Sequence, residues 1–254
     1  MSGDADAIAM PPAYGPLCTA FYDLDKPAPP ADALAFYLQR CRQVQGPVLE
    51  PMCGSGRFLV PLARAGLDID GTDAAPAMLA ACRRHADQAG VSPGLYLQSM
   101  GRLALPRLYR LAMVPSGSIG LLSPTQLPAA LASLHAQLEP GAALLLELIQ
   151  PEALADTTPP PPRELQIDAH TRLVYHCQPH MTADGQAVVY QGRYEKYRDN
   201  TLVAVEQESL QVWRHTPETL LTLLRASGFT GAFEHRHVYD TLAADQCVLI
   251  EAIT

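Results

Sequence analysis

The chain has 254 residues, of which 48% are hydrophobic and 17% are charged, and it carries a formal net charge of −8 at pH 7. This length can bury a core without disulfide or metal staples, and it predicts one large domain or a domain with an insert. The negative charge argues against a nucleic-acid-binding protein, because affinity for phosphate backbones comes mostly from Lys and Arg.

Cysteine spacing and the first residues predict the compartment. No two of the six cysteines have metal-ligand or C-x-x-C spacing, which favours free thiols in a reducing environment. The N-terminus carries Asp4 and Asp6 and lacks the basic and apolar segments of a signal peptide. The longest apolar run, 142–149, is too short to span a bilayer. We therefore expect a cytoplasmic protein with no metal site and no membrane partner.

Strands and helices alternate along residues 30–149. Apolar residues at helical spacing predict helices over 30–44, 54–65, 76–89 and 124–138. Short apolar runs predict strands over 47–50, 67–72, 95–98, 110–114 and 142–149. Because strands that alternate with helices form parallel sheets through right-handed crossovers, we expect an α/β fold with a largely parallel sheet.

The pattern changes after Pro151, where four consecutive prolines, 159–162, indicate a stiff connector. Strand-like runs follow over 172–180, 187–198 and 202–213. The pairs between these runs are hairpin signals, Asp184-Gly185 and Asp199-Asn200. We therefore predict an antiparallel β meander inserted into the α/β domain. A helix and two strands complete the chain, over 216–228, 229–239 and 246–253.

The most informative segment is a strand, a tight turn and a helix start, Val48-Leu49-Glu50-Pro51-Met52-Cys53-Gly54-Ser55-Gly56-Arg57. Glycine has no Cβ, so Gly54 and Gly56 let the backbone approach a ligand closely. The helix start offers free N–H groups and the positive end of the helix dipole. The second strand ends in Asp73, 17 residues beyond Gly56, where an acid can accept hydrogen bonds from both hydroxyls of a ribose. The combination predicts a nucleoside-binding site.

These residues resemble two motifs of the class I S-adenosylmethionine-dependent methyltransferases. The segment from Glu50 to Gly56 matches the first motif, acid-x-Gly-x-Gly-x-Gly, except that Met52 replaces the first Gly. Asp73-Ala74-Ala75-Pro76-Ala77-Met78-Leu79 resembles the second motif, an acid followed by a Pro-Met-Leu helix start. The resemblance covers about 30–150 and 214–254. It implies a Rossmann-like, seven-stranded, mostly parallel sheet with an antiparallel last strand, and S-adenosyl-L-methionine as the cofactor, with S-adenosyl-L-homocysteine as its product.

The resemblance divides the chain into three parts. Residues 30–158 and 214–254 would form the S-adenosylmethionine-binding domain, residues 1–29 a lid segment, and residues 159–213 the meander. The meander and the Tyr-rich N-terminal segment resemble the small-molecule branch of the family, such as the glycine and sugar N-methyltransferases. We expect the meander to cover the substrate or to form a dimer contact, in a protein that is a monomer or a homodimer.

Family resemblance places the cofactor against the two motifs and the residues after the third and fourth strands. The implied cofactor-binding residues are Glu50, Met52, Cys53, Gly54, Ser55, Gly56, Arg57, Asp73, Ala74, Met78, Ser99, Met100 and Val114. Ser99 stands where the family usually has an Asp that accepts the adenine amino group. A neutral hydroxyl accepts more weakly than a carboxylate, so we expect weakened cofactor binding.

Candidates for binding and activating the methyl acceptor lie over the carboxyl ends of the strands, where α/β sheets bind ligands. Substrate contacts are expected from Ser116, Ser118, Gln150, Tyr175, Tyr190, Arg193 and Tyr194, and Glu147 lies near the same strand end as Gln150. The catalytic candidates are Tyr14, Tyr22 and His176. His176 is included because a His is the natural base near neutral pH.

The expected acceptor is a small organic molecule, with an amine preferred to a hydroxyl. Methyl transfer to an amine mainly needs alignment, whereas a hydroxyl needs a general base. Enzymes that methylate exocyclic amines of bases or glutamine carry Asn/Asp-Pro-Pro-Tyr after strand four, and this chain has Val114-Pro115-Ser116-Gly117. No aspartate-rich metal site follows that strand, which argues against a metal-dependent catechol enzyme.

Two other functions stay open. An NAD(P)-dependent oxidoreductase could use Gly54-Ser55-Gly56 and Asp73 as its fingerprint, but it needs a small residue where this chain has Leu59. The second alternative is a methyltransferase-fold protein that binds without catalysis. Three departures from the family pattern support it, namely Met52, Ser99 and Ile119-Gly120-Leu121, which stands where some relatives have Gly-His-Leu.

Overall fold

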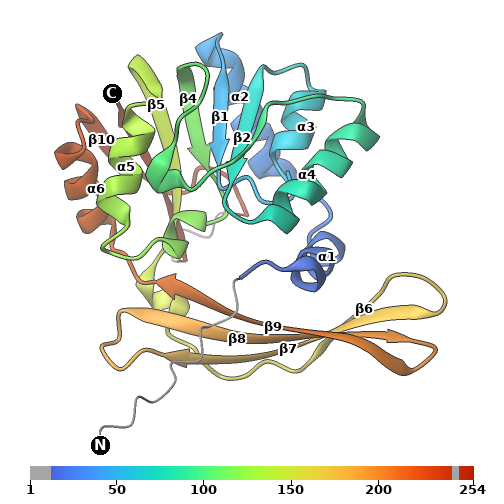
Figure 1. Ribbon diagram of the computed structural model, residues 1–254. Coiled ribbons are helices and arrows are strands. Elements are labelled where there is room, and N and C mark those ends of the chain that lie inside the picture. The colour runs from blue at the N-terminus through green and yellow to red at the C-terminus, as the bar shows by residue number, and fades with distance from the viewer. Residues whose placement is uncertain (1–12, 242–245) are drawn as a thin grey trace, which may run out of the picture.

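The computed structural model describes residues 13–241 and 246–254, and its centre is a seven-stranded sheet in the order β10-β11-β5-β4-β1-β2-β3 (Figure 1). Its strands are β1 (Val48–Pro51), β2 (Ile69–Asp73), β3 (Leu95–Leu97), β4 (Tyr109–Val114), β5 (Leu138–Ile149), β10 (Gly231–His235) and β11 (Cys247–Ile253). Strand β11 runs antiparallel to both of its neighbours, β5 and β10. The remaining neighbours pair in parallel. The predicted Rossmann-like sheet with an antiparallel last strand is confirmed.

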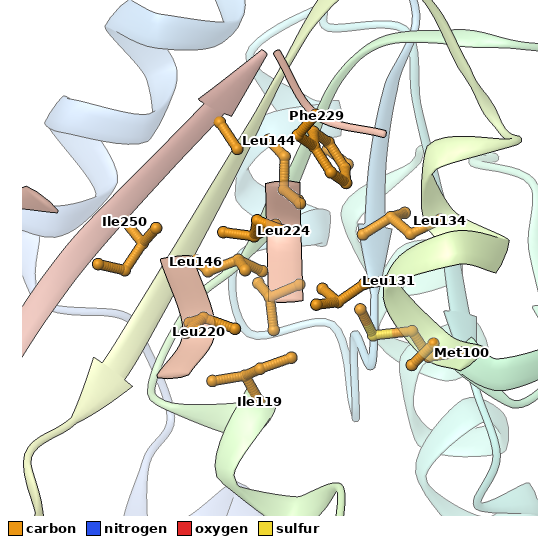
Figure 2. Close-up of a cluster of buried hydrophobic side chains, with 14 of the residues drawn as sticks. Met100, Ile119, Leu131, Leu134, Leu144, Leu146, Leu220, Leu224, Phe229 and Ile250 are labelled. Carbon is orange, nitrogen blue, oxygen red and sulfur yellow. The ribbon is translucent and has the colours of Figure 1, made fainter. Parts of the chain in front are cut away.

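Helices cover both faces of this sheet. The helices that cover it are α2 (Ala31–Val44), α3 (Leu59–Arg64), α4 (Pro76–Ala89), α5 (Leu127–His135) and α6 (Pro217–Ala226). The chain also has a helix α1 (Pro16–Asp25) and short 3₁₀ turns η1 (Met100–Arg102), η2 (Ser118–Leu121) and η3 (Pro151–Leu154). One core cluster joins α2, α3 and α4 to the sheet, and a second joins α5 and α6 to the other face. Figure 2 shows this second cluster, in which leucines of α5, α6 and β5 interdigitate. The covered sheet explains why its central strands are apolar on both sides.

The inserted segment forms a second, four-stranded antiparallel sheet in the order β6-β7-β8-β9. Its strands are β6 (Arg163–Gln166), β7 (Thr171–Met181), β8 (Ala187–Arg198) and β9 (Thr201–Trp213). Asp199 and Asn200 both have positive φ, at 46° and 63°, as a two-residue hairpin turn requires. The predicted meander is therefore present, and β6 adds a strand that the sequence did not indicate.

Helix α1 lies between the two sheets (Figure 1). It packs against α4 on one side and against β8 on the other. The ring of Phe21 lies 5.3 Å from that of Tyr175 and 5.6 Å from that of Tyr194, centroid to centroid. The aromatic residues of the N-terminal segment thus join the meander to the α/β domain.

Some predicted boundaries differ from the structure. The helix predicted over 54–65 is restricted to α3, because residues 54–58 form the turn itself. The helix predicted over 124–138 ends at His135, and Leu138 instead begins β5 by pairing with Tyr109. Helix α1 was not predicted, since its sequence mixes aromatic and turn residues.

Two further features follow from the described residues alone. Within 13–241 and 246–254, no helix has the length and apolar character needed to cross a bilayer. Across the same residues, no three His, Cys, Asp or Glu side chains gather closely enough to hold a metal ion.

Candidate functional site

A cavity of about 340 Å³ opens at the carboxyl ends of β1, β2, β3 and β4. This volume is within the range of small-molecule sites, about 300–1,000 Å³. Its lining residues are Ala13, Tyr14, Tyr22, Glu50, Met52, Cys53, Gly54, Arg57, Phe58, Asp73, Ala74, Ala75, Pro76, Met78, Gln98, Ser99, Met100, Pro115, Ser116, Ser118, Leu121 and Leu122. Because it opens at the carboxyl ends of the parallel strands, the cavity lies at the edge where α/β sheets bind ligands.

The glycine turn after β1 forms one wall of this cavity. Gly54 has a φ of +55°, and a Cβ added there would meet only the sulfur of Met78 within 4 Å, at 3.9 Å. Gly56 has a φ of +85°, and a Cβ there would lie 2.6 Å from the Cys82 sulfur. Gly54 therefore keeps space open on the ligand side, whereas Gly56 permits close packing behind the turn.

Asp73 ties the end of β2 to this turn. Its carboxylate accepts hydrogen bonds from the N–H of Gly54 at 2.7 Å and from the N–H of Ala75 at 2.8 Å. Burial raises the pKa of Asp73, and these backbone donors oppose that shift. Its carboxylate lines the cavity while being held in place by backbone groups, as a rigid acceptor for ligand hydroxyls should be.

Glu50 is a buried acid with an unmet hydrogen-bonding capacity. Its side chain is 2% exposed, lines the cavity, and has no hydrogen-bond partner at Oε2. Burial raises the pKa of this carboxyl well above its usual value. A buried polar atom without a partner is costly, and such atoms are uncommon in native structures. The orphaned oxygen, together with the open space at Gly54, fits a polar ligand that brings hydrogen-bond donors.

The far end of the cavity is lined by Met78, Ser99 and Met100. Met78 and Met100 are each 3% exposed, so they present an apolar surface suited to an aromatic ring. The Ser99 hydroxyl accepts a hydrogen bond from the N–H of Gly101 and caps η1. Gln98, which was not predicted, also lines this end, and its amide is held by both backbone groups of Ala104.

The opposite end is lined by Tyr14, Tyr22, Ser116 and Ser118 and by apolar neighbours that were not predicted, Ala13, Phe58, Pro115, Leu121 and Leu122. Burial raises the pKa of both tyrosines. Across the cavity as described, the charged lining side chains are Glu50, Asp73 and Arg57. No histidine belongs to this lining.

Two glutamates of β9 anchor the N-terminal segment over the cavity. Glu208 accepts a hydrogen bond from the backbone N–H of Tyr14 at 3.0 Å, and it also accepts one from the Tyr194 hydroxyl at 2.8 Å. Glu206 accepts hydrogen bonds from the N–H groups of Leu17 and Cys18, each at 2.9 Å. Sequence reasoning missed both glutamates, because nothing in a single strand indicates which helix terminus it meets.

Several predicted residues do not line the cavity. Val114 and Ser55 are buried, and neither they nor Gly56 belong to the lining. Gln150, Tyr175, Tyr190, Arg193, Tyr194 and His176 are also outside the lining. Tyr175 and Tyr194 instead stack on each other, with ring centroids 4.6 Å apart, and pack against α1.

His176 and Arg193 lie on the face of the meander turned away from α1. Tyr194 packs against α1, and neighbouring residues of a strand point to opposite faces, so Arg193 and its cross-strand partner His176 face outward. There Glu195 lies 3.5 Å from the His176 ring and 2.7 Å from the Arg193 guanidinium. This register places His176 outside the cavity lining, and its expected catalytic role stays a prediction.

The fold and the cavity define a Rossmann-like α/β domain with an inserted sheet beside the carboxyl ends of its strands. Residues 48–141 match the family described as a methyltransferase domain. The matched segment is the central part of the chain, from β1 to the start of β5, and it agrees with the family resemblance drawn from the two motifs. No protein of curated function matches the sequence.

Solved structures share this architecture over nearly the whole chain. The sugar N-methyltransferase KedS8 from a Streptoalloteichus species is 17% identical, with a TM-score of 0.78 over 100% of this chain and 98% of that one. CalS10 from Micromonospora echinaspora, an amino pentose methyltransferase solved with bound S-adenosylmethionine, is 18% identical, with a TM-score of 0.70 over 97% and 100%. The glycopeptide N-methyltransferase MtfA, complexed with S-adenosylmethionine, is 22% identical, with a TM-score of 0.55 over 89% and 95%. At these identities the likeness establishes the fold.

Proposed function

We propose that the chain is an S-adenosylmethionine-dependent methyltransferase that methylates the nitrogen of a small amine. The observation that carries the choice of an amine is the acceptor end of the cavity, whose hydroxyls belong to two serines and two tyrosines. Neutral serines are poor bases, and burial raises the pKa of both tyrosines, which keeps them protonated near neutral pH. A hydroxyl acceptor would therefore lack a base at this end of the cavity, whereas an amine that binds in its neutral form already has a free lone pair.

The cofactor would lie along the wall built by the glycine turn and Asp73. Asp73 would accept hydrogen bonds from the ribose hydroxyls, and Met78 and Met100 would enclose the adenine. Glu50 and Arg57 would face the charged methionyl end, with Gly54 leaving room for it. S-Adenosylmethionine would supply a methyl group carried on a sulfonium. The amine lone pair would form the N–C bond while the S–C bond breaks and leaves its electrons on sulfur. The ammonium product would then release a proton to water.

Three neighbours support the small-amine assignment through their described functions, since two are N-methyltransferases of sugars or glycopeptides and one acts on an amino pentose. Amino sugars are therefore the first acceptors to test. The expectations of a cytoplasmic location and of a monomer or meander-linked homodimer stay predictions.

Isothermal titration calorimetry of S-adenosylmethionine tests the cofactor assignment. The parent should bind the cofactor. Asp73→Ala should bind it at least tenfold more weakly, because the variant loses charged hydrogen bonds worth about 1.5–3 kcal/mol. Asp156→Ala, at an exposed residue, is the control and should bind like the parent. Equal binding by Asp73→Ala would overturn the ribose assignment. Binding of NAD but not of S-adenosylmethionine would instead support the oxidoreductase alternative.

Release of S-adenosylhomocysteine tests the acceptor class. Glucosamine and glucose form a matched pair, differing in one amine and one hydroxyl. Turnover of amino sugars but not of their hydroxyl counterparts is the expected result. Turnover of the hydroxyl compounds would overturn N-methylation, and cofactor binding without turnover of any acceptor would support the non-catalytic alternative.

A further inference from the structure

Glu147, near the end of β5, lies directly behind the acceptor wall. Its side chain is 4% exposed, and its carboxylate accepts three hydrogen bonds. The donors are the Tyr37 hydroxyl at 2.5 Å, the Tyr239 hydroxyl, and the backbone N–H of Ser116 at 2.6 Å. These groups come from α2, from the connection between β10 and β11, and from the segment after β4. One carboxylate therefore holds together three segments around the cavity.

The bond to Ser116 stabilises an uncommon backbone conformation. Ser116 has a φ of +60°, in the left-handed region that costs a non-glycine residue about 1–2 kcal/mol. Gly117 follows with a φ of +68°, so the chain turns sharply here. Ser116 lines the cavity, and its conformation sets the shape of the acceptor wall. A strong acceptor behind its N–H is the physical reason this turn persists.

The same peptide unit orients the hydroxyl of Ser118. All described peptide bonds are trans, so the N–H of Ser116 and the carbonyl of Pro115 point in opposite directions. With the N–H directed to Glu147, the Pro115 carbonyl accepts a hydrogen bond from the Ser118 hydroxyl at 3.1 Å. A serine hydroxyl has one proton and two lone pairs, so the Ser118 oxygen is left as an acceptor.

We propose that Glu147 is a positioning residue that fixes the Pro115–Ser116 peptide and thereby presents Ser118 to the substrate as a hydrogen-bond acceptor. The inference rests on the proposed function and adds a specificity rule to it. A methyl acceptor that donates an N–H to Ser118 is held with its nitrogen lone pair free. A tertiary amine without an N–H gains nothing from this contact.

The first test measures binding without turnover. The complex with S-adenosylhomocysteine is titrated with glucosamine and, as the matched probe, glucose. Ser118→Ala should weaken glucosamine binding about fivefold to tenfold, the effect of one hydrogen bond, and leave the affinity for S-adenosylhomocysteine unchanged. Ser118→Thr keeps a hydroxyl and should bind like the parent.

A double-mutant cycle then asks whether Glu147 acts through Ser118. Glu147→Leu should weaken glucosamine binding as much as Ser118→Ala does, and the double variant should be no weaker than either. Glu147→Gln should restore binding, because its amide oxygen can still accept the Ser116 N–H. Glu251→Gln, on the neighbouring strand β11 but away from the cavity, is the control for a half-buried, hydrogen-bonded glutamate and should match the parent.

The amide proton of Ser116 supplies a readout that needs no acceptor. Its NMR resonance should be shifted downfield in the parent and in Glu147→Gln, and should move upfield in Glu147→Leu. If Glu147→Leu does not fold, the comparison of Ser118→Ala with Ser118→Thr decides whether the Ser118 hydroxyl contributes to glucosamine binding.

The outcomes separate this inference from the proposed function. Failure of the parent to bind S-adenosylhomocysteine overturns the proposed function. Binding of S-adenosylhomocysteine combined with any of three results overturns the role of Glu147 and Ser118 alone: glucosamine binding no tighter than glucose binding, additive effects in the cycle, or no effect of Ser118→Ala.

Discussion

The carboxylate of Asp73 accepts a hydrogen bond from the backbone N–H of Gly54 at 2.7 Å, across 19 residues of sequence. The two motifs that resemble those of the methyltransferases are therefore one hydrogen-bonded unit. In the proposed function the same side chain also binds the cofactor, so substitutions of Asp73 should change both the stability of the fold and the cofactor affinity.

We expect Asp73→Asn to separate these two roles. The Asn oxygen can still accept one backbone N–H, so the free energy of unfolding should fall by only about 1 kcal/mol. Cofactor affinity should fall more than tenfold, because a neutral amide accepts ribose hydroxyls weakly and its N–H₂ accepts none. Denaturant unfolding and calorimetry on the same samples measure the two effects. Parallel losses in both would show that Asp73 acts only through the fold.

Gly54→Ala should mainly weaken cofactor binding, whereas Gly56→Ala should mainly lower the stability of the fold. An Ala at 54 would project its methyl group into the cavity and cost about 1–2 kcal/mol for its positive φ. Its main effect should be weaker cofactor binding. An Ala at 56 would also clash with Cys82, so its unfolding midpoint should fall further. Similar unfolding midpoints for the two variants would contradict this division.

Glu50→Gln should stabilise the protein without ligand while weakening cofactor binding. The substitution replaces a carboxyl whose ionised form is disfavoured by burial with a neutral amide, and it should raise the free energy of unfolding by about 1–3 kcal/mol at neutral pH. Because the pKa of Glu50 is raised in the folded state, lowering the pH toward the usual value of 4.5 protonates the folded form first and stabilises the parent. The gap between parent and variant should therefore narrow as the pH falls. A constant gap from pH 8 to pH 5 would show that ionisation of Glu50 is not its cause.

Glu206→Ala should loosen the N-terminus of α1. The loss of its acceptors for Leu17 and Cys18 should cost about 0.5–2 kcal/mol, as for other helix caps. Hydrogen exchange at these two amides should accelerate, while exchange in the central sheet should not. Gln207→Ala, one residue further along β9, points to the opposite face and serves as the control. If the Leu17 and Cys18 amides exchanged equally slowly in Glu206→Ala and in Gln207→Ala, Glu206 would not be what holds the N-terminus of α1.

His176→Ala should leave methyl transfer to an amino sugar within about twofold of the parent, the range expected of a surface substitution of about 0.5 kcal/mol. This residue faces away from α1 and contacts Glu195. Steady-state kinetics over pH 6–9 provide the measurement. A large fall in kcat would support the role expected from the sequence.

The sequence by itself determined the features that depend on neighbours in the chain. Helical and strand periodicity predicted the α/β core, and Asp199-Asn200 predicted the hairpin with positive φ at both residues. The glycine turn and Asp73 lie where the motif spacing placed them, because a strand, a turn and a helix start are local structures. The wall of the cavity formed by this turn and Asp73 was therefore largely predictable.

The tertiary structure decided the acceptor side. The contacts that form it join residues far apart in sequence, such as Tyr14 with Glu208 across 194 positions and Ser116 with Glu147 across 31. Strand register assigned His176 to the outer face of the meander and Tyr175 to the inner one. A side-chain period of two makes each strand ambiguous between two faces until a neighbouring element packs on one of them, and that packing is a property of the fold.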